Sequence, residues 1–137
     1  MKPKIALITI LAGDVTKMVQ FYREVLGFAV ELDSGQYVEF QSEGVRFAIC
    51  DRSVLENTTG HPSYKESHRG HTFELAFPVD SPAAVDTAYA EITARGATPI
   101  KAPANMPWGQ RTAFFADPEG NIHELFAGLP AETEEGL

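Results

Sequence analysis

Apolar and polar positions alternate along the chain in two similar series, and each series predicts one extended run, one helix and three further extended runs. In the first series, an apolar run at 4–11 is followed by a helical pattern that begins after Asp14 and ends at Gly27. An aspartate is a good helix N-cap, and a glycine readily takes the left-handed conformation that ends a helix. Three shorter extended runs are then predicted, near 28–32, 36–41 and 45–50.

The second series repeats this order. An extended run at 72–79 leads to Ser81, a predicted N-cap with a proline after it, and to a helix that ends at Gly96. Further extended runs are predicted near 98–101, 111–116 and 121–126. Because a unit of this size is too small to bury its own apolar face, the repeat predicts an α+β fold of two paired βαβββ modules.

These patterns divide the chain into a first module at 1–52, a connecting loop at 53–70, a second module at 71–128 and an acidic, disordered tail at 129–137. The connector is rich in Ser, Thr, Asn, Gly and His and has no obvious structure, so we expect a solvated linker or a lid over a site. The tail is acidic because it carries Glu132, Glu134 and Glu135.

The clearest local motif is Asp117-Pro118-Glu119-Gly120, which lies between the last two extended runs. Proline is favoured at the second position of a type I turn and glycine at the fourth, so the motif predicts a hairpin. The strand after the turn carries one acid, Glu124, among apolar neighbours, and His123 alternates away from it. A carboxylate there is costly unless it faces a cleft, a cation or a hydrogen-bond donor.

A second strand acid is predicted to face the same surface. In the run at 72–77, Glu74 alternates with Phe73, Leu75 and Phe77, which should pack on the helix of their module. Two acids on one surface share a proton, bind a cation or accept hydrogen bonds from a donor such as Arg111. The alternative for Glu74 and for Glu124 is an ordinary exposed position on a strand.

Composition narrows the classes of function. The net charge is −8, from 11 basic and 19 acidic residues, which disfavours nucleic acid as a partner and would help to attract a cationic small molecule. No apolar run reaches the length of about 18 residues that a membrane span needs. The single cysteine, Cys50, excludes an internal disulfide and suits a reducing cytoplasm, where we expect it to be a buried free thiol.

The double strand–helix–three-strand order, the stretch from Asp14 through Phe21-Tyr22 to Leu26-Gly27-Phe28, and the turn that leads to Glu124-Leu125 resemble the vicinal-oxygen-chelate superfamily. That superfamily includes glyoxalases, extradiol dioxygenases, fosfomycin-resistance enzymes and bleomycin-resistance binding proteins. The resemblance covers most of residues 4–127. It implies two βαβββ modules whose mixed sheets curl around a cleft, commonly in a homodimer.

The resemblance also implies where metal ligands would lie. Metal-dependent members place His or Glu on the first and last strands of each module, and the matching positions here are Leu7, Phe47, Glu74 and Glu124. Only Glu124 coincides with the expected residue. A catalytic divalent metal normally needs about three protein ligands, and Zn, Fe and Ni favour an imidazole among them. We therefore expect no catalytic metal and no other cofactor.

The branch of bleomycin-resistance proteins lacks these ligands and carries a Pro-Trp-Gly segment before an Arg-led strand, as Pro107-Trp108-Gly109 and Arg111 do here. This likeness implies antibiotic resistance by stoichiometric binding of a flat or cationic molecule in an acidic cleft with aromatic walls. Packing in a core or dimer interface is the alternative for Trp108, and neutralising Glu124 or an equivalent acid is the alternative for Arg111. The predicted ligand-binding residues are Trp108, Arg111, Glu74, Glu124, Tyr37, Phe47 and Tyr64.

A second hypothesis is a lyase, isomerase or dioxygenase of the same superfamily. Glu124 and Glu74 would then serve as acid–base groups or as ligands of Zn, Ni, Fe or Mn, with a third ligand such as His68 or His71. Glyoxalase-type chemistry needs a base beside a carbonyl and an electrophile that holds the enediolate. The sequence offers possible bases but no evident electrophile apart from Arg111.

Overall fold

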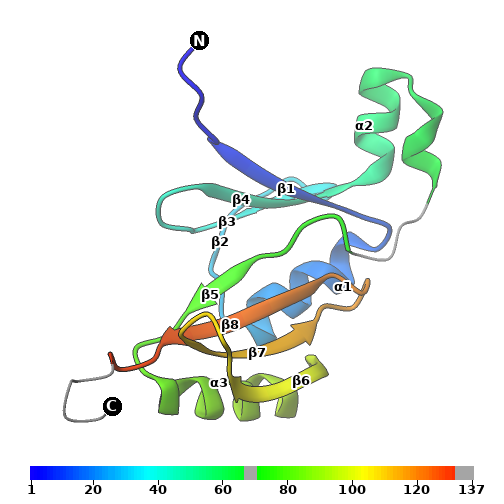
Figure 1. Ribbon diagram of the computed structural model, residues 1–137. Helices are drawn as coiled ribbons and strands as arrows, with labels where there is room; N and C mark the ends of the chain where they lie inside the picture. Colours follow the sequence, from blue (N-terminus) through cyan, green and yellow to red (C-terminus); the bar gives the residue numbers. More distant parts are fainter. Residues whose placement is uncertain (67–70, 132–137) are drawn as a thin grey trace. The chain divides into compact units, whose positions relative to one another are not determined.

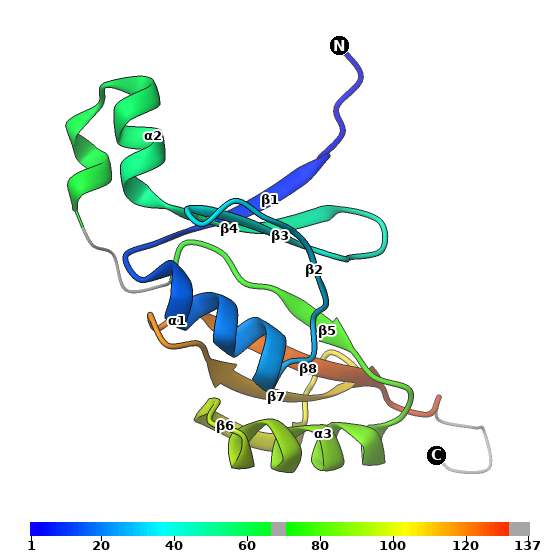
Figure 2. The same ribbon diagram turned by 180° about the vertical axis from the view of Figure 1, so that it is seen from behind.

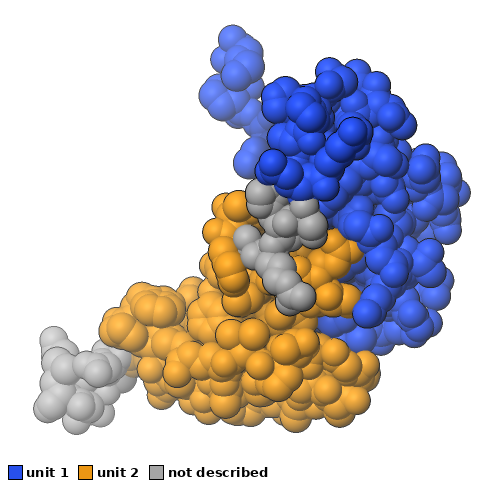
Figure 3. Space-filling view, turned by 90° about the vertical axis from the view of Figure 1, so that its right-hand side faces the viewer, with its two compact units in different colours: residues 1–69 blue, residues 70–137 orange. Residues whose placement is uncertain are grey.

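The computed structural model describes residues 1–66 and 71–131, and it divides into two compact units, Met1–Arg69 and Gly70–Leu137 (Figure 3). Each unit holds a four-stranded mixed sheet and a helix that follows its first strand (Figures 1 and 2). The predicted α+β fold of two βαβββ modules is therefore confirmed. In the described part of the chain, no helix is long and apolar enough to cross a membrane.

The sheet of the first unit has the strand order β1-β4-β3-β2, with β1 parallel to β4 and the other neighbours antiparallel. The helix begins as α1, Val15–Gln20, and continues as a π-helical turn, Phe21–Val25. Asp14 caps it by accepting a hydrogen bond from a backbone N–H at 3.0 Å, and Gly27 ends it with a φ of +89°. Both helix ends are as predicted. The strands are β1 Leu7–Ala12, β2 Val30–Asp33, β3 Tyr37–Phe40 and β4 Arg46–Asp51.

Four aromatic rings join the helix to the sheet in the first unit. Tyr22 lies in the helix, Phe28 follows it, and Phe40 and Phe47 come from β3 and β4. Their ring centroids are 5.2–6.3 Å apart, and all four rings contact one another. Cys50 is also buried, and burial raises the pKa of its thiol, as expected for a free core cysteine.

The connector predicted at 53–70 contains regular structure: a helix, α2 (Arg52–Thr59), and a 3-10 turn, Pro62–Lys65. The sequence pattern showed no obvious structure in this connector and did not predict these two elements. The Asp51 carboxylate caps α2. It accepts hydrogen bonds from the backbone N–H and from the hydroxyl group of Ser53, at 2.9 and 2.7 Å. No side chain of α2 is buried, so no apolar stripe marked the helix in the sequence. Two predicted segments lie outside the described residues, 67–70 of the connector and 132–137 of the tail.

The second unit repeats the topology with the strand order β5-β8-β7-β6, and β5 runs parallel to β8. Its helix, α3 (Pro82–Ala94), starts at Ser81, whose hydroxyl accepts a backbone N–H at 3.1 Å. Val85 and Ile92 of α3 are buried, and the helix packs against β7 and β8. β5 is shorter than predicted and β6 is longer. The strands are β5 Ala76–Pro78, β6 Thr98–Asn105, β7 Gln110–Ala116 and β8 Ile122–Gly128.

The predicted hairpin between β7 and β8 is confirmed. The Gly120 N–H donates to the Asp117 carbonyl at 3.0 Å, which closes the turn, and Gly120 has a φ of +84°. The Asp117 side chain is buried and accepts the N–H groups of Glu119 (2.9 Å) and Asn121 (3.0 Å). It also accepts the Asn121 side-chain amide at 2.8 Å. A buried carboxylate with three donors therefore fixes the geometry of the turn.

Replacing Asp117 with alanine is expected to destabilise the protein by about 2–4 kcal/mol, because three donors in a buried turn lose their acceptor. Urea unfolding followed by circular dichroism measures the change. Asp33→Ala is the matched control, since Asp33 accepts the Gly35 N–H at 2.9 Å in an exposed turn where water can replace it. Equal losses of stability in the two variants would contradict this account of the hairpin.

Candidate functional site

The last strands of the two units can be matched from the turn before each strand, where Gly44 and Gly120 both have a φ of +84°. In the second unit Glu124 of β8 pairs with Phe114 of β7, and in the first unit Ala48 of β4 pairs with Glu39 of β3. Each also pairs with the parallel edge strand of its sheet. Ala48, four residues after Gly44, thus holds in the first unit the place that Glu124, four residues after Gly120, holds in the second. The sequence placed this position near Phe47, one residue away, and a shift of one residue turns the side chain to the other face, toward the aromatic core.

The structure brings Glu74 and Glu124 together, as the alternation predicted. Glu74 lies two residues before Ala76, which is the partner of Glu124 in β5. Burial of Glu124, the charge of Glu74 and a side-chain hydrogen bond between them raise the pKa of Glu124. Two carboxyl groups can form that hydrogen bond only when one of them is protonated. Burial and the neighbouring acid therefore both disfavour the charged form of Glu124.

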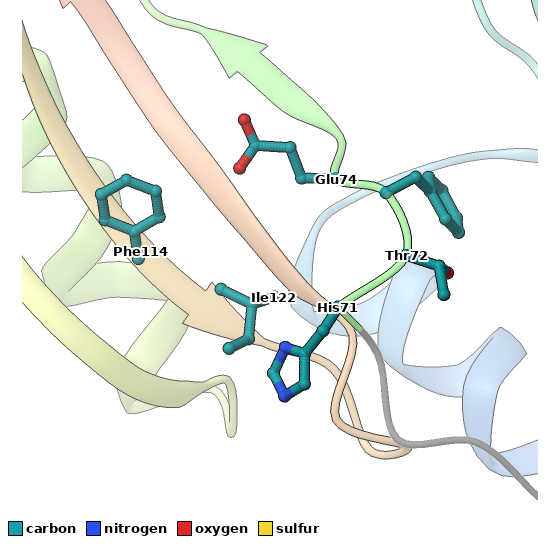
Figure 4. A pocket seen from close by; sticks show the side chains of 6 residues that line it. His71, Thr72, Glu74, Phe114 and Ile122 are labelled. Carbon is teal, nitrogen blue, oxygen red and sulfur yellow. The ribbon is translucent and has the colours of Figure 1, made fainter.

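An open hollow of about 370 Å³ lies beside Glu74 (Figure 4). One side of it is the segment before β5, and the other is the sheet surface at Phe114 and Ile122 (Figure 4). Phe114 stands directly opposite Glu124 in the β7–β8 ladder. The hollow thus combines an aromatic ring, an aliphatic side chain and an acid. Its lining residues are His71, Thr72, Phe73, Glu74, Phe114 and Ile122.

His123 lies on the opposite face of the sheet, as its alternation with Glu124 predicted. It is fully buried against the rings of Phe77 and Phe115, at centroid distances of 6.1 and 5.9 Å. Its Nδ1 accepts the Leu75 N–H at 3.0 Å. Burial lowers the pKa of His123 to about 4, partly offset by the charge of Asp117, so the ring is neutral at pH 7 and carries its proton on Nε2.

Arg111 is bound on the α3 side of its sheet. Its Nε and Nη2 donate to the Asp86 carboxylate of α3 at 3.0 and 2.8 Å, and its Nη1 donates to Asn105 at 3.0 Å. The acid that Arg111 neutralises is therefore Asp86 rather than Glu124, and the guanidinium lowers the pKa of Asp86. Arg111 and Phe114 are three residues apart in β7 and so face opposite sides of the sheet. The sequence could not identify Asp86 as the partner, because Asp86 lies 25 positions away on a helix.

Trp108 lies in the turn between β6 and β7, and it is 59% exposed. Its Nε1–H donates to the Gln110 side chain at 3.1 Å. Phe114 is four residues beyond Gln110, which is about 14 Å along an extended strand. Trp108 therefore lies just before the start of β7, whereas the hollow lies at Phe114, farther along the strand. Within the second unit, the predicted aromatic wall at Trp108 and the two acids thus do not form one pocket.

The other predicted aromatic residues belong to the first unit. Tyr64 lies half-buried in the 3-10 turn, and Phe47 lies in the aromatic core. Tyr37 donates its hydroxyl hydrogen bond to Glu39 at 2.7 Å, and Arg46 donates to the same carboxylate through Nε and Nη2 at 2.9 and 2.7 Å. Arg46 and Tyr37 lower the pKa of Glu39 to about 2. This cluster was missed, although an acid within the apolar run around Glu39 is the same signal that singled out Glu124.

Metal-ligating side chains do not gather in the described residues: no group of three or more His, Cys, Asp or Glu there could hold a metal ion. His71 lines the hollow together with Glu74 (Figure 4). His68, the other loop histidine considered as a ligand, lies outside the described residues.

A family model for the Glyoxalase/Bleomycin resistance protein/Dioxygenase superfamily matches residues 4–125. The chain is 31% identical to a glyoxalase/bleomycin resistance protein/dioxygenase from Nocardioides, with a TM-score of 0.85 over 98% of this chain and 89% of that one. A family enzyme from Burkholderia phytofirmans PsJN is 26% identical, with a TM-score of 0.80 over 90% and 98% of the two chains. The uncharacterized protein YraH of Bacillus subtilis (strain 168) is 26% identical over 132 residues, 92% of this chain and 99% of YraH.

The same substitution at Glu124 and at Glu39 is expected to shift stability in opposite directions as pH rises. The pKa of Glu124 is raised in the folded state, so its ionisation costs stability, and Glu124→Gln should gain stability over the wild type once pH exceeds the ordinary glutamate value. The pKa of Glu39 is lowered to about 2, so its ionised form stabilises the fold. Glu39→Gln should therefore lose stability relative to the wild type as pH rises from about 2 to about 4.5.

Urea unfolding at several pH values from 3 upward measures both differences on one scale. Glu43→Gln, at an exposed loop position of the first unit, is the control that should follow the wild type. If Glu124→Gln and Glu39→Gln moved stability in the same direction with pH, the contrast between the two acids would be wrong.

Proposed function

Because the chain belongs to the glyoxalase/bleomycin resistance protein/dioxygenase superfamily, we propose that it binds a small aromatic cation on the sheet surface of its second unit. The positive group of this ligand sits at Glu74 and Glu124, and its flat apolar part sits against Phe114 and Ile122. The pair of interacting acids beside the hollow is the observation that carries this proposal.

A comparison of the strand acids supports a cationic ligand. In the first unit the chain supplies its own cation, since Arg46 lies 2.7 Å from Glu39. In the second unit Arg111 forms its ion pair with Asp86, and no Lys or Arg among the described residues pairs with Glu74 or Glu124. A half-buried carboxylate next to a second one is disfavoured in its charged form. A bound monocation relieves this repulsion.

The apolar surroundings favour an aromatic cation over a small hydrated one. Phe114 offers the face of a ring for stacking and for cation–π attraction, which is strongest where water is excluded. Ile122 extends the apolar surface beside it. A ligand with a flat ring and a fixed positive charge uses both features. Binding of a cationic antibiotic, assembly as a homodimer and a cytoplasmic location stay predictions.

The proposal is tested with 1-methylquinolinium and its neutral counterpart quinoline, whose rings have the same shape. Isothermal titration calorimetry at pH 8 should show that the cation binds more tightly than quinoline. Glu74→Gln and Glu124→Gln should each weaken binding of the cation by about tenfold, a loss of roughly 1.4 kcal/mol, and should leave quinoline almost unaffected.

Two control variants sharpen the result. Glu43→Gln removes an exposed carboxylate of the first unit and should leave both affinities unchanged. Trp108→Ala should also retain binding, because Trp108 lies away from the hollow. Equal affinity for the cation and for quinoline would contradict the proposal. So would Zn, Ni, Fe or Mn bound stoichiometrically to the purified, tag-free protein and lost in Glu124→Gln, since that result would support the enzyme hypothesis.

A further inference from the structure

We propose that His123 is a positioning residue of this binding surface: from the opposite face of the sheet it holds the Leu75 peptide and thereby sets Glu74 beside Glu124. The ligand measurements below rest on the proposed function, whereas the spectroscopic ones do not.

Glu74 needs such support because it lies outside the regular part of its sheet. The β5–β8 ladder begins at Ala76, and the residues from His71 to Glu74 are exposed. His71 has a φ of +70°, which is uncommon for a residue other than glycine. The hydrogen bonds of the β5–β8 ladder therefore do not extend to Glu74. The position of its carboxyl group depends instead on the hydrogen bonds of the next residue, Leu75.

Both backbone polar groups of Leu75, its carbonyl and its N–H, form hydrogen bonds to residues of β8. Its carbonyl accepts the Glu124 N–H at 3.0 Å, and its N–H donates to Nδ1 of His123 at 3.0 Å. The acceptor of this N–H is thus a side chain rather than a backbone carbonyl. The two hydrogen bonds connect Leu75, the neighbour of Glu74, to two consecutive residues of β8.

The surroundings of His123 fix its ring in the orientation that this bond needs. The ring is fully buried and meets Phe77 and Phe115 edge to face, with interplanar angles of 81° and 68°. Its Nε2 lies 3.9 Å from a carboxylate oxygen of Asp117. A neutral ring with its proton on the Nε2 side leaves Nδ1 as an acceptor for Leu75.

The first unit shows what the fold does without this histidine. The aligned registers place Phe47 at the position of His123 and Leu7 at the position of Glu74. There the parallel ladder already includes Leu7, so the backbone alone holds the residue that corresponds to Glu74. A phenylalanine fills the same core position as His123 but has no acceptor. The second unit therefore has a shorter ladder and uses an imidazole nitrogen in place of the missing ladder bond.

His123→Phe, which places the residue of the first unit at this position, and His123→Asn, whose amide oxygen can replace Nδ1 as an acceptor, test the proposal. His123→Phe should weaken 1-methylquinolinium binding by about tenfold, and His123→Asn should retain most of the affinity. In the same variants, carbon-13 titration of the Glu124 carboxyl group should show its pKa moving back toward the ordinary value in His123→Phe only. Urea unfolding reports the stability of each variant separately.

A measurement on the wild type keeps the proposal testable if His123→Phe does not fold. A nitrogen–nitrogen scalar coupling across the hydrogen bond between Leu75 and the His123 ring should be observed by NMR. Its absence would overturn the proposal, and so would equal effects of His123→Phe and His123→Asn on both affinity and the Glu124 titration. If the wild type binds no 1-methylquinolinium, the proposed function fails, while the coupling and the Glu124 titration still decide the role of His123.

Discussion

The electrostatic interaction between the carboxyl groups of Glu74 and Glu124 is the constraint on which the proposed binding surface depends. Burial of Glu124 and the neighbouring carboxylate both raise the pKa of Glu124 and disfavour its charged form. The side chains that line the hollow then determine which kind of cation can bind beside these carboxyl groups. Phe114 and Ile122 favour a cation with an apolar ring, and the bond from Leu75 to His123 keeps Glu74 in place.

The two units show how one supersecondary plan can carry different electrostatics. Both have a mixed four-stranded sheet with a helix after the first strand, and both place a glutamate in an inner strand. Arg46 of the same sheet neutralises Glu39, so this carboxylate has a structural role. Glu124 has a second acid as its neighbour, while Arg111 pairs with Asp86 on the other face. The units therefore share a fold but differ in where their strand glutamates lie and in whether an arginine pairs with them.

The fold could be predicted because its signals are local. Helix caps at Asp14 and Ser81, the glycine at Gly27 and the turn at Asp117 each act within a few residues. The pairing of Glu74 with Glu124 also followed from alternation. The partner of Arg111 did not, because Asp86 lies on a helix 25 positions away in the sequence. Helix α2 was missed because it buries no side chain, and the role of Phe47 was missed because alternation is sensitive to a shift of one residue.

Proton release on ligand binding tests the central claim most directly. Calorimetry of 1-methylquinolinium binding in buffers of different ionisation enthalpy measures the protons exchanged at a pH near the raised pKa of Glu124. If the cation displaces the proton of Glu124, the wild type releases up to about one proton, and the release is absent in Glu124→Gln and at pH values well above that pKa. Binding of the cation with no proton release at any pH would contradict the account.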